Sequence, residues 1–256
     1  GKHFRVKGPL NVSRSPQGYP VVVQAGQSEA GRDLAAETAE VIFTAHQKIE
    51  TAQEFYRDIK ARAVGKGRDP DHVLIMPGVA PFVGRTEAEA RAKYDQLTDL
   101  IPEADGLALL NGLAGGTLDL RALDLDGPLP PAPETEGMKS RQALTRQIAD
   151  DNGFTIRQLY QWIATARGHL TLVGTPEQIV DTLQEWFENE AADGFNILPP
   201  WLPGGLDDFI ALVTPELQRR GLFRTAYEGR TLRENLGLPY PINRHTAARA
   251  ASQAAE

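Results

Sequence analysis

The sequence alternates short apolar runs with stretches of helical spacing, and this alternation restricts the possible folds more than any other feature. Residues 20–26 (PVVVQAG) form a β-branched run that ends at Gly26, and an Ala-rich helical stretch follows. Further runs at 40–46 (EVIFTAH) and 73–84 (VLIMPGVAPFVG) each precede another helical stretch. Strands that alternate with helices in this way pair in parallel and carry the helices on the sheet. The sequence therefore predicts an α/β fold with a parallel sheet.

A long excursion interrupts the alternation between about residues 102 and 170. Its first part, 102–137, contains GLAGG and GPLPPAPETEG, and this content of glycine and proline predicts no regular element there. Two helices are expected near 138–150 and 155–166, before the alternation resumes. We interpret the excursion as an insertion and not as another strand-helix unit.

The last unit begins with a clear helix start. Thr175 with Gln178 predicts a capping box, in which each residue satisfies a backbone N–H of the first turn, and Thr86 with Glu89 predicts another. A fourth strand is expected at 193–200 (DGFNILPP). Four parallel strands are half of an eight-stranded barrel. The alternative is an open doubly wound sheet, but QAGQSEAG lacks the G-x-G-x-x-G spacing of its dinucleotide loop.

Composition excludes several classes of function. The chain has 27 basic and 34 acidic residues, a net charge of -7 and no basic stripe, so we expect no nucleic-acid partner. No run approaches the roughly 20 apolar residues of a membrane span. There is no cysteine and no secretory apolar core in the first residues, so a reducing cytoplasm is the expected location. No cluster with the spacing of metal ligands is present.

Several segments carry a resemblance to a known family. They are FRVKGPLNVSRSPQGYPVVVQAGQSEAGRDLAAETAEVIFTA, LIMPGVAPFVGRTEAEA, LDLDGPLP, VGTPEQIVDTLQEWF and DGFNILPPWLPGGLDDFIALVTPELQRRGLFR, which together cover most of residues 4–238. In these segments the chain resembles the nitrilotriacetate monooxygenase group of the bacterial luciferase-like flavin monooxygenases. The resemblance implies a (β/α)8 TIM-barrel type of fold, of which residues 1–240 would be the C-terminal four β/α units. The first four strands would precede Gly1, the insertion 102–170 would precede the last unit, and 241–256 would be a flexible tail.

The resemblance also implies an activity. Such enzymes use reduced FMN, supplied by a separate flavin reductase, and O2 to oxygenate a small organic substrate, and the insertion would form a lid that selects it. Two alternatives stay open: a deazaflavin-dependent oxidoreductase of the same superfamily, and a non-catalytic flavin-binding or assembly fragment. Because half a barrel has two unpaired edges, we expect a homo-oligomer or association with the N-terminal half.

The turn after the first strand is the strongest candidate for a cofactor site. It consists of Gln24, Ala25, Gly26, Gln27 and Ser28. A strand that feeds a helix N-terminus presents N–H groups and a positive dipole end to an anion. From the residues alone, a plain turn with Ser28 as helix cap is the simpler interpretation. The resemblance instead identifies the turn with the loop that receives the FMN phosphate. Glu29, which follows it, suits the helix dipole but would oppose a phosphate.

Four further residues are candidates for substrate contacts. His46 closes the second strand, where the catalytic face of a barrel lies, although a lone histidine is more often a packing residue. Gly78 interrupts the third strand and predicts either a bend or a ligand pressed against the backbone. Arg167 and His169 end the excursion and could together reach an anion, although a helix dipole also explains the arginine. The sequence assigns no catalytic residue.

Overall fold

The computed structural model describes residues 1–8, 11–116, 118–131 and 139–243. The chain divides into two compact units, one made of Gly1–Val22 with the segment from Ala226 onward, the other of Val23–Thr225. Two predicted features lie largely outside the described residues: the tail at 241–256, and the end of the irregular stretch, 132–138. No helix in the described part is long and apolar enough to span a membrane.

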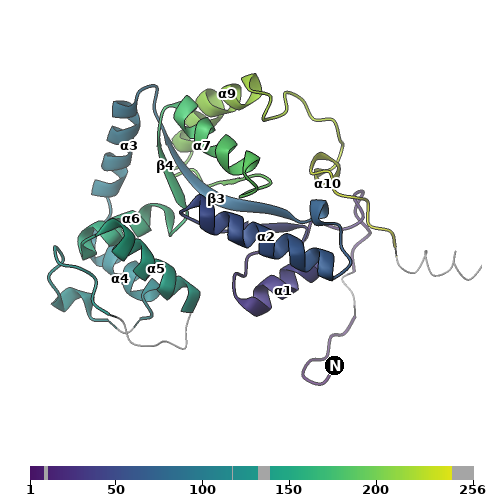
Figure 1. Cartoon of the computed structure of the whole chain (residues 1–256), viewed down its shortest axis with the longest axis horizontal. Coiled ribbons are helices and arrows are strands. Elements are labelled where there is room, and N and C mark those ends of the chain that lie inside the picture. Colours follow the sequence, from purple (N-terminus) through teal and green to yellow (C-terminus); the bar gives the residue numbers. More distant parts are fainter. Residues whose placement is uncertain (9–10, 117, 132–138, 244–256) are drawn as a thin grey trace, which may run out of the picture. The chain divides into compact units, whose positions relative to one another are not determined.

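The larger unit is built on a parallel sheet (Figure 1). Its strands are β1 (Val23–Gln24), β2 (Val41–Thr44), β3 (Leu74–Val83), β4 (Leu170–Gly174) and β5 (Asn196–Ile197). β1 pairs with β2, β2 with β3, and β3 with both β4 and β5, and every one of these pairings is parallel. The parallel pairing of the four predicted runs is thus confirmed, although β1 and β5 are shorter than the runs that predicted them.

β4 is a strand that the sequence interpretation did not count. The N–H of Leu74 donates to Glu40 beside β2, and the N–H of Gly84 donates to Gly174 at the end of β4. Residues an even number of positions apart along a strand form hydrogen bonds on the same side, and Leu74 and Gly84 are ten positions apart. β4 therefore lies on the same side of β3 as β2, and it pairs with β3 beyond Pro77, where the pairing with β2 ends. The excursion therefore returns to the sheet at the carboxyl end of β2.

Helices follow the strands as expected. In the larger unit they are α1 (Glu29–Thr38), α2 (Ile49–Gly65), α3 (Glu87–Asp99), α4 (Glu103–Leu113), α5 (Lys139–Asn152), α6 (Ile156–Ala166), α7 (Pro176–Glu188), α8 (Gly204–Asp208), the π-helical η3 (Phe209–Val213) and α9 (Thr214–Arg219), with 3-10 turns η1 (Pro70–His72) and η2 (Leu120–Ala122). The capping box of Thr175 and Gln178 is confirmed. The predicted box at Thr86 is only half formed, because the Glu89 carboxylate accepts from the N–H of Arg85 instead of Thr86.

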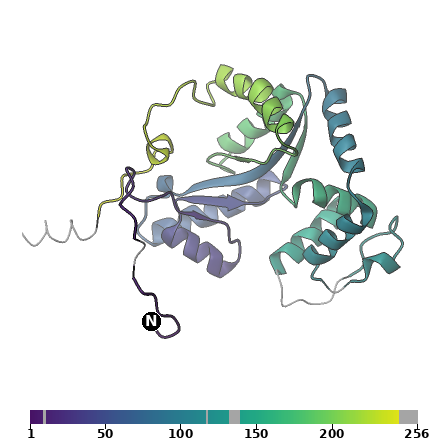
Figure 2. The same ribbon diagram turned by 180° about the vertical axis from the view of Figure 1, so that it is seen from behind.

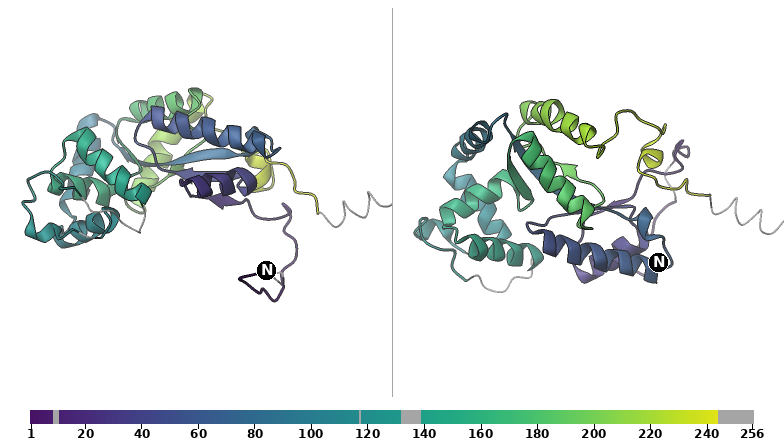
Figure 3. Two further views of the ribbon diagram at one scale, coloured as in Figure 1. Left: turned by 60° about the horizontal axis from the view of Figure 1, so that its bottom comes forward. Right: turned by 45° about the horizontal axis from the view of Figure 1, so that its top comes forward.

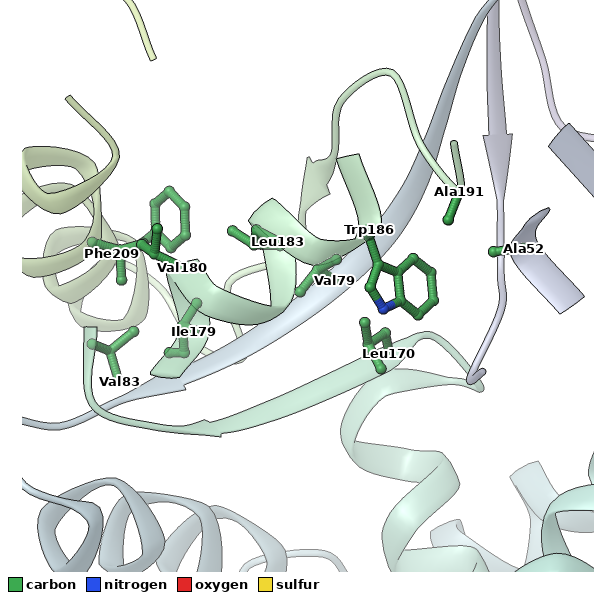
Figure 4. Packing of buried hydrophobic residues seen from close by; sticks show 11 residues of the cluster. Ala52, Val79, Val83, Leu170, Ile179, Val180, Leu183, Trp186, Ala191 and Phe209 are labelled. Atoms are coloured by element: carbon green, nitrogen blue, oxygen red, sulfur yellow. The ribbon is translucent and has the colours of Figure 1, made fainter. Parts of the chain in front are cut away.

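One face of β3 holds the core. Ile75, Val79 and Val83 are separated by even numbers of residues and so point to the same face of the strand. Ile75 belongs to a buried cluster with α1 and α2, whereas Val79 and Val83 belong to a cluster centred on α7. Figure 4 shows the second cluster, in which Trp186 of α7 lies close to Leu170 of β4. Helices therefore cover one face of the sheet, as they do on the outside of a barrel.

The excursion is more regular than its composition predicted. α4 begins at Glu103, so the prediction that 102–137 contains no regular element is wrong for its first part. Leu110 of α4 packs in a buried cluster with residues of α5 and α6, and these three helices lie together (Figures 2 and 3). Gly106 serves this packing, because a Cβ there would lie 2.3 Å from a ring carbon of Tyr160. Gly106 therefore makes room for an aromatic ring and does not mark a loop.

The smaller unit joins segments from both ends of the sequence. Its helix α10 (Leu232–Asn235) carries Arg233, which is 1% exposed and lies over the ring of Tyr19 at 4.8 Å. The Arg233 N–H donates to Gln17 over 3.2 Å, and the Arg14 guanidinium donates to Tyr240 over 3.3 Å. These contacts hold residues 14–19 against the segment that follows Thr231.

Candidate functional site

The turn between β1 and α1 is compact and internally hydrogen-bonded. The Gln24 side chain accepts from the N–H of Gly26 over 2.9 Å, and the Ser28 hydroxyl accepts from the N–H of Gly31 over 3.2 Å. A Cβ at Gly31 would lie 3.0 Å from the carbonyl carbon of Gly26, so the turn closes directly onto the first turn of α1. Gly31 thus allows this close approach, whereas a Cβ at Gly26 would lie 2.5 Å from the Gln24 amide and 3.2 Å from Gly31. Ser28 caps the helix, and its hydroxyl can still donate to an anion.

Gln27 ties this turn to the end of β2. Its side-chain amide donates to the Thr44 hydroxyl and, over 3.3 Å, to the carbonyl of Ala45. The backbone carbonyl of Gln27 accepts from the Arg32 guanidinium over 2.9 Å. The turn after β1 and the residues that follow β2 therefore form one continuous surface at the carboxyl ends of the two strands.

His46 lies on this surface as a neutral imidazole. Its Nε2 lies 2.9 Å from the Thr44 hydroxyl, and its ring packs against Phe55 of α2 at a centroid distance of 5.2 Å. Burial, and then the positive charge of Arg32, lower the pKa of His46 from 6.5 to about 4. At neutral pH the ring can accept or donate a hydrogen bond, but it carries no charge.

A pocket of about 320 Å³ opens beside His46. One wall comes from the turn and from the segment that joins β2 to α2, and the other comes from α5 and α6. The lining residues are Gln27, Ala45, His46, Gln47, Lys48, Thr51, Leu144, Gln147, Ile148, Asp151, Asn152 and Trp162. The pocket thus lies at the carboxyl ends of β1 and β2, and helices of the excursion close one side of it.

Two polar contacts hold the excursion against the end of β2. The ammonium group of Lys48 lies 2.7 Å from the Asp151 carboxylate of α5, and the Gln47 side chain donates to the Gly168 carbonyl over 2.8 Å. Sequence reasoning missed Gln47, Lys48 and Asp151. Gln47 and Lys48 directly follow His46 in the sequence, and this was a usable signal. No local pattern predicted that Asp151, about 100 residues later, would lie at the same place.

Gly78 and His169, both predicted site residues, lie against each other. His169 is buried at 8% exposure and stacks on Phe43 of β2 with ring centroids 4.9 Å apart. A Cβ at Gly78 would lie 2.5 Å from the His169 ring and 2.9 Å from that of Phe43. The glycine therefore accommodates two rings over the face of β3 opposite the core. The prediction that Gly78 interrupts the strand is wrong, because β3 runs without a break from Leu74 to Val83, and contact of Gly78 with a ligand stays a prediction.

Arg167 has a different environment from His169. It is the C-cap of α6 in the left-handed conformation, with φ of 52°, and its side chain is exposed. Its joint contact with an anion stays a prediction. In the described residues no three His, Asp or Glu side chains are grouped so that they could hold a metal ion.

Comparisons with known proteins give a consistent result. The model of the luciferase-like monooxygenase family matches residues 1–193. N-acetyl-S-(2-succino)cysteine monooxygenase of Bacillus subtilis is 53% identical over 96% of this chain and 56% of its own length. Nitrilotriacetate monooxygenase component A of Aminobacter aminovorans is 51% identical over 95% of this chain and 54% of its own length.

A solved structure supports the same relation at the level of the fold. A riboflavin lyase, determined with modified FMN and its substrate riboflavin, aligns with a TM-score of 0.74 at 34% identity. The alignment covers 96% of this chain and 53% of the lyase. The chain thus spans about half the length of the proteins that it matches.

Proposed function

The chain belongs to the luciferase-like monooxygenase family, and on that premise we propose that it is part of an enzyme that oxygenates a small organic substrate with reduced FMN and O2. The observation that carries the proposal is the junction at Gln27, where the turn after β1 adjoins the pocket beside His46. A phosphate held by the turn and a substrate held in the pocket would be neighbours. Both would lie at strand carboxyl ends, where barrel enzymes place their sites.

We propose that the chain supplies the C-terminal four β/α units of a barrel. Among the described residues β1 pairs only with β2, and β5 pairs only with β3, so each has an edge that a further strand could join. The relatives are about twice as long as this chain, which leaves enough sequence for four more units. In that arrangement 102–170 is the insertion that precedes the last unit.

The residues divide into two roles. The turn Gln24–Ser28 receives the FMN phosphate, with the Ser28 hydroxyl as donor and the N-terminus of the ten-residue α1 as a favourable dipole. The pocket residues His46 and Gln47 contact the substrate, and α5 and α6 act as the lid over it. Arg167 and His169 lie on the connection by which the chain returns from α6 to β4, and Gly78 of β3 lies against His169.

The bound flavin would supply the redox chemistry with O2, while this chain positions it and excludes water. The word "component" in the name of the Aminobacter relative supports a system of several proteins, and we propose a separate flavin reductase as partner. A deazaflavin-dependent activity is not favoured, because the curated relatives described above are named monooxygenases.

Substitution in the turn tests this assignment in the complete protein. Ser28→Ala should weaken the binding of reduced FMN by about 0.5 to 3 kcal/mol, a range that covers the loss of one hydrogen bond to a neutral or to a charged group. Gly26→Val should weaken it more, because a Cβ at Gly26 would lie 2.5 Å from the Gln24 amide and 3.2 Å from Gly31. Calorimetric titration measures both affinities. Unchanged affinity in both variants, with folding verified by circular dichroism, would leave Ser28 as a helix cap only.

A non-catalytic flavin-binding role predicts a different result from an enzyme. The complete protein, supplied with reduced FMN and O2, should then bind the flavin without oxygenating any member of a panel of small organic acids and sulfides. Product detection by mass spectrometry separates the two functions. His46→Ala, which alters the pocket, serves as the control.

A further inference from the structure

The proposed phosphate turn has an acidic neighbour that the fold neutralises. Glu29 is the first residue of α1 and directly follows Ser28. A carboxylate at this place would repel a bound phosphate and could compete with it for the N–H groups of the turn. In the structure the Glu29 carboxylate lies 2.7 Å from the Arg62 guanidinium, in the last turn of α2. The carboxylate is thus drawn toward α2.

Arg62 is the centre of a larger network. It also contacts Asp33 at 2.9 Å and Asp58 at 2.8 Å. The other oxygen of Asp58 accepts from Arg32 over 2.9 Å, and Arg32 in turn donates to the Gln27 carbonyl over 2.9 Å. The network therefore reaches the turn by two routes, through the charge of Glu29 and through the hydrogen bond to Gln27.

An apolar contact, separate from the network, also docks α2 on α1. The two helices share a buried apolar cluster, in which Ala35 of α1 and Ala39, which follows it, belong with Phe55, Ile59 and Ala63 of α2. Glu29 and Asp33 are largely exposed, and exposed ion pairs contribute little to stability. Loss of Arg62 should therefore leave the fold intact, and the effect of that loss should appear at the turn.

We propose that Arg62 is a positioning residue for the flavin phosphate, which acts by holding the Glu29 carboxylate away from the turn. The proposal rests on the assignment of Gln24–Ser28 as the phosphate site. In this proposal Arg62 acts on the phosphate through the Glu29 carboxylate and not by direct contact. Loss of Arg62 should therefore affect ligands with a phosphate and spare those without one.

The test compares reduced FMN with reduced riboflavin, which lacks the phosphate, in titrations of the complete protein. Arg62→Ala should weaken FMN binding by about two- to fivefold, the range for one charge at a helix terminus, and leave riboflavin binding unchanged. The double variant with Glu29→Gln should regain the lost affinity, and Arg62→Lys should keep most of it. The deficit should shrink as salt rises, because exposed charges are screened.

Arg219→Ala is a matched control, because Arg219 also pairs with a carboxylate, Glu216 at 2.6 Å, but on α9. It should change neither affinity. Equal weakening of FMN and riboflavin by Arg62→Ala, or no recovery with Glu29→Gln, would overturn the proposal. If Ser28→Ala weakens FMN binding and Arg62→Ala does not, only this inference fails. If neither does, the phosphate site itself fails.

Discussion

Gly78→Ala is the most direct test of the packing beneath the candidate site. The added Cβ would lie 2.5 Å from Nδ1 and 3.0 Å from Cγ of His169, and 2.9 Å from Cε2 of Phe43. Ordinary van der Waals contact begins near 3.4 Å, so the imidazole must retreat by about 1 Å. His169 is buried and stacked on Phe43, so that movement also disturbs the ring contact. We expect a loss of about 1 to 3 kcal/mol in the free energy of unfolding, the usual cost of overpacking.

Urea unfolding, followed by circular dichroism, measures this loss. Gly112→Ala is the matched control, because Gly112 lies within α4 and a Cβ there has no atom within 4 Å. That change should stabilise the protein by about 0.5 to 1 kcal/mol. Combining Gly78→Ala with His169→Ala should cost less than the two changes separately, because the smaller side chain removes the clash. Full additivity, or a Gly78→Ala variant as stable as the native protein, would refute the packing argument.

Further predictions concern pH and helix capping. Because the pKa of His46 is about 4 when folded and 6.5 ordinarily, the unfolded chain binds more protons between these values, and stability should fall as pH falls from 6.5 to 4 by up to about 3 kcal/mol. Urea midpoints across this range should show a shallower slope in His46→Gln, and an unchanged slope would assign the proton uptake to other groups. Thr175→Ala should lower the free energy of unfolding by about 1 kcal/mol, because α7 loses its cap. Thr38→Ala, at an exposed end of α1, is the control and should change the melting temperature little.

The architecture of the larger unit followed from local patterns. Runs such as PVVVQAG and EVIFTAH predicted parallel strands, and the capping box at Thr175 predicted the start of α7, because both signals depend on neighbouring residues only. Gly106 shows the limit of such signals. The sequence favours a loop around it, but the ring of Tyr160, more than 50 residues later, requires a glycine within a helix.

The candidate site divides in the same way. The sequence by itself determined that a turn leads from β1 into a capped helix and that a histidine follows β2, because a strand end and a helix start are both local. Only the tertiary structure decided what surrounds them: α5 beside His46, the ring of His169 against Gly78, and Arg62 on Glu29. Each of these contacts joins residues more than 30 positions apart, and which distant side chains meet is set by the packing of helices on the sheet, which no local pattern encodes.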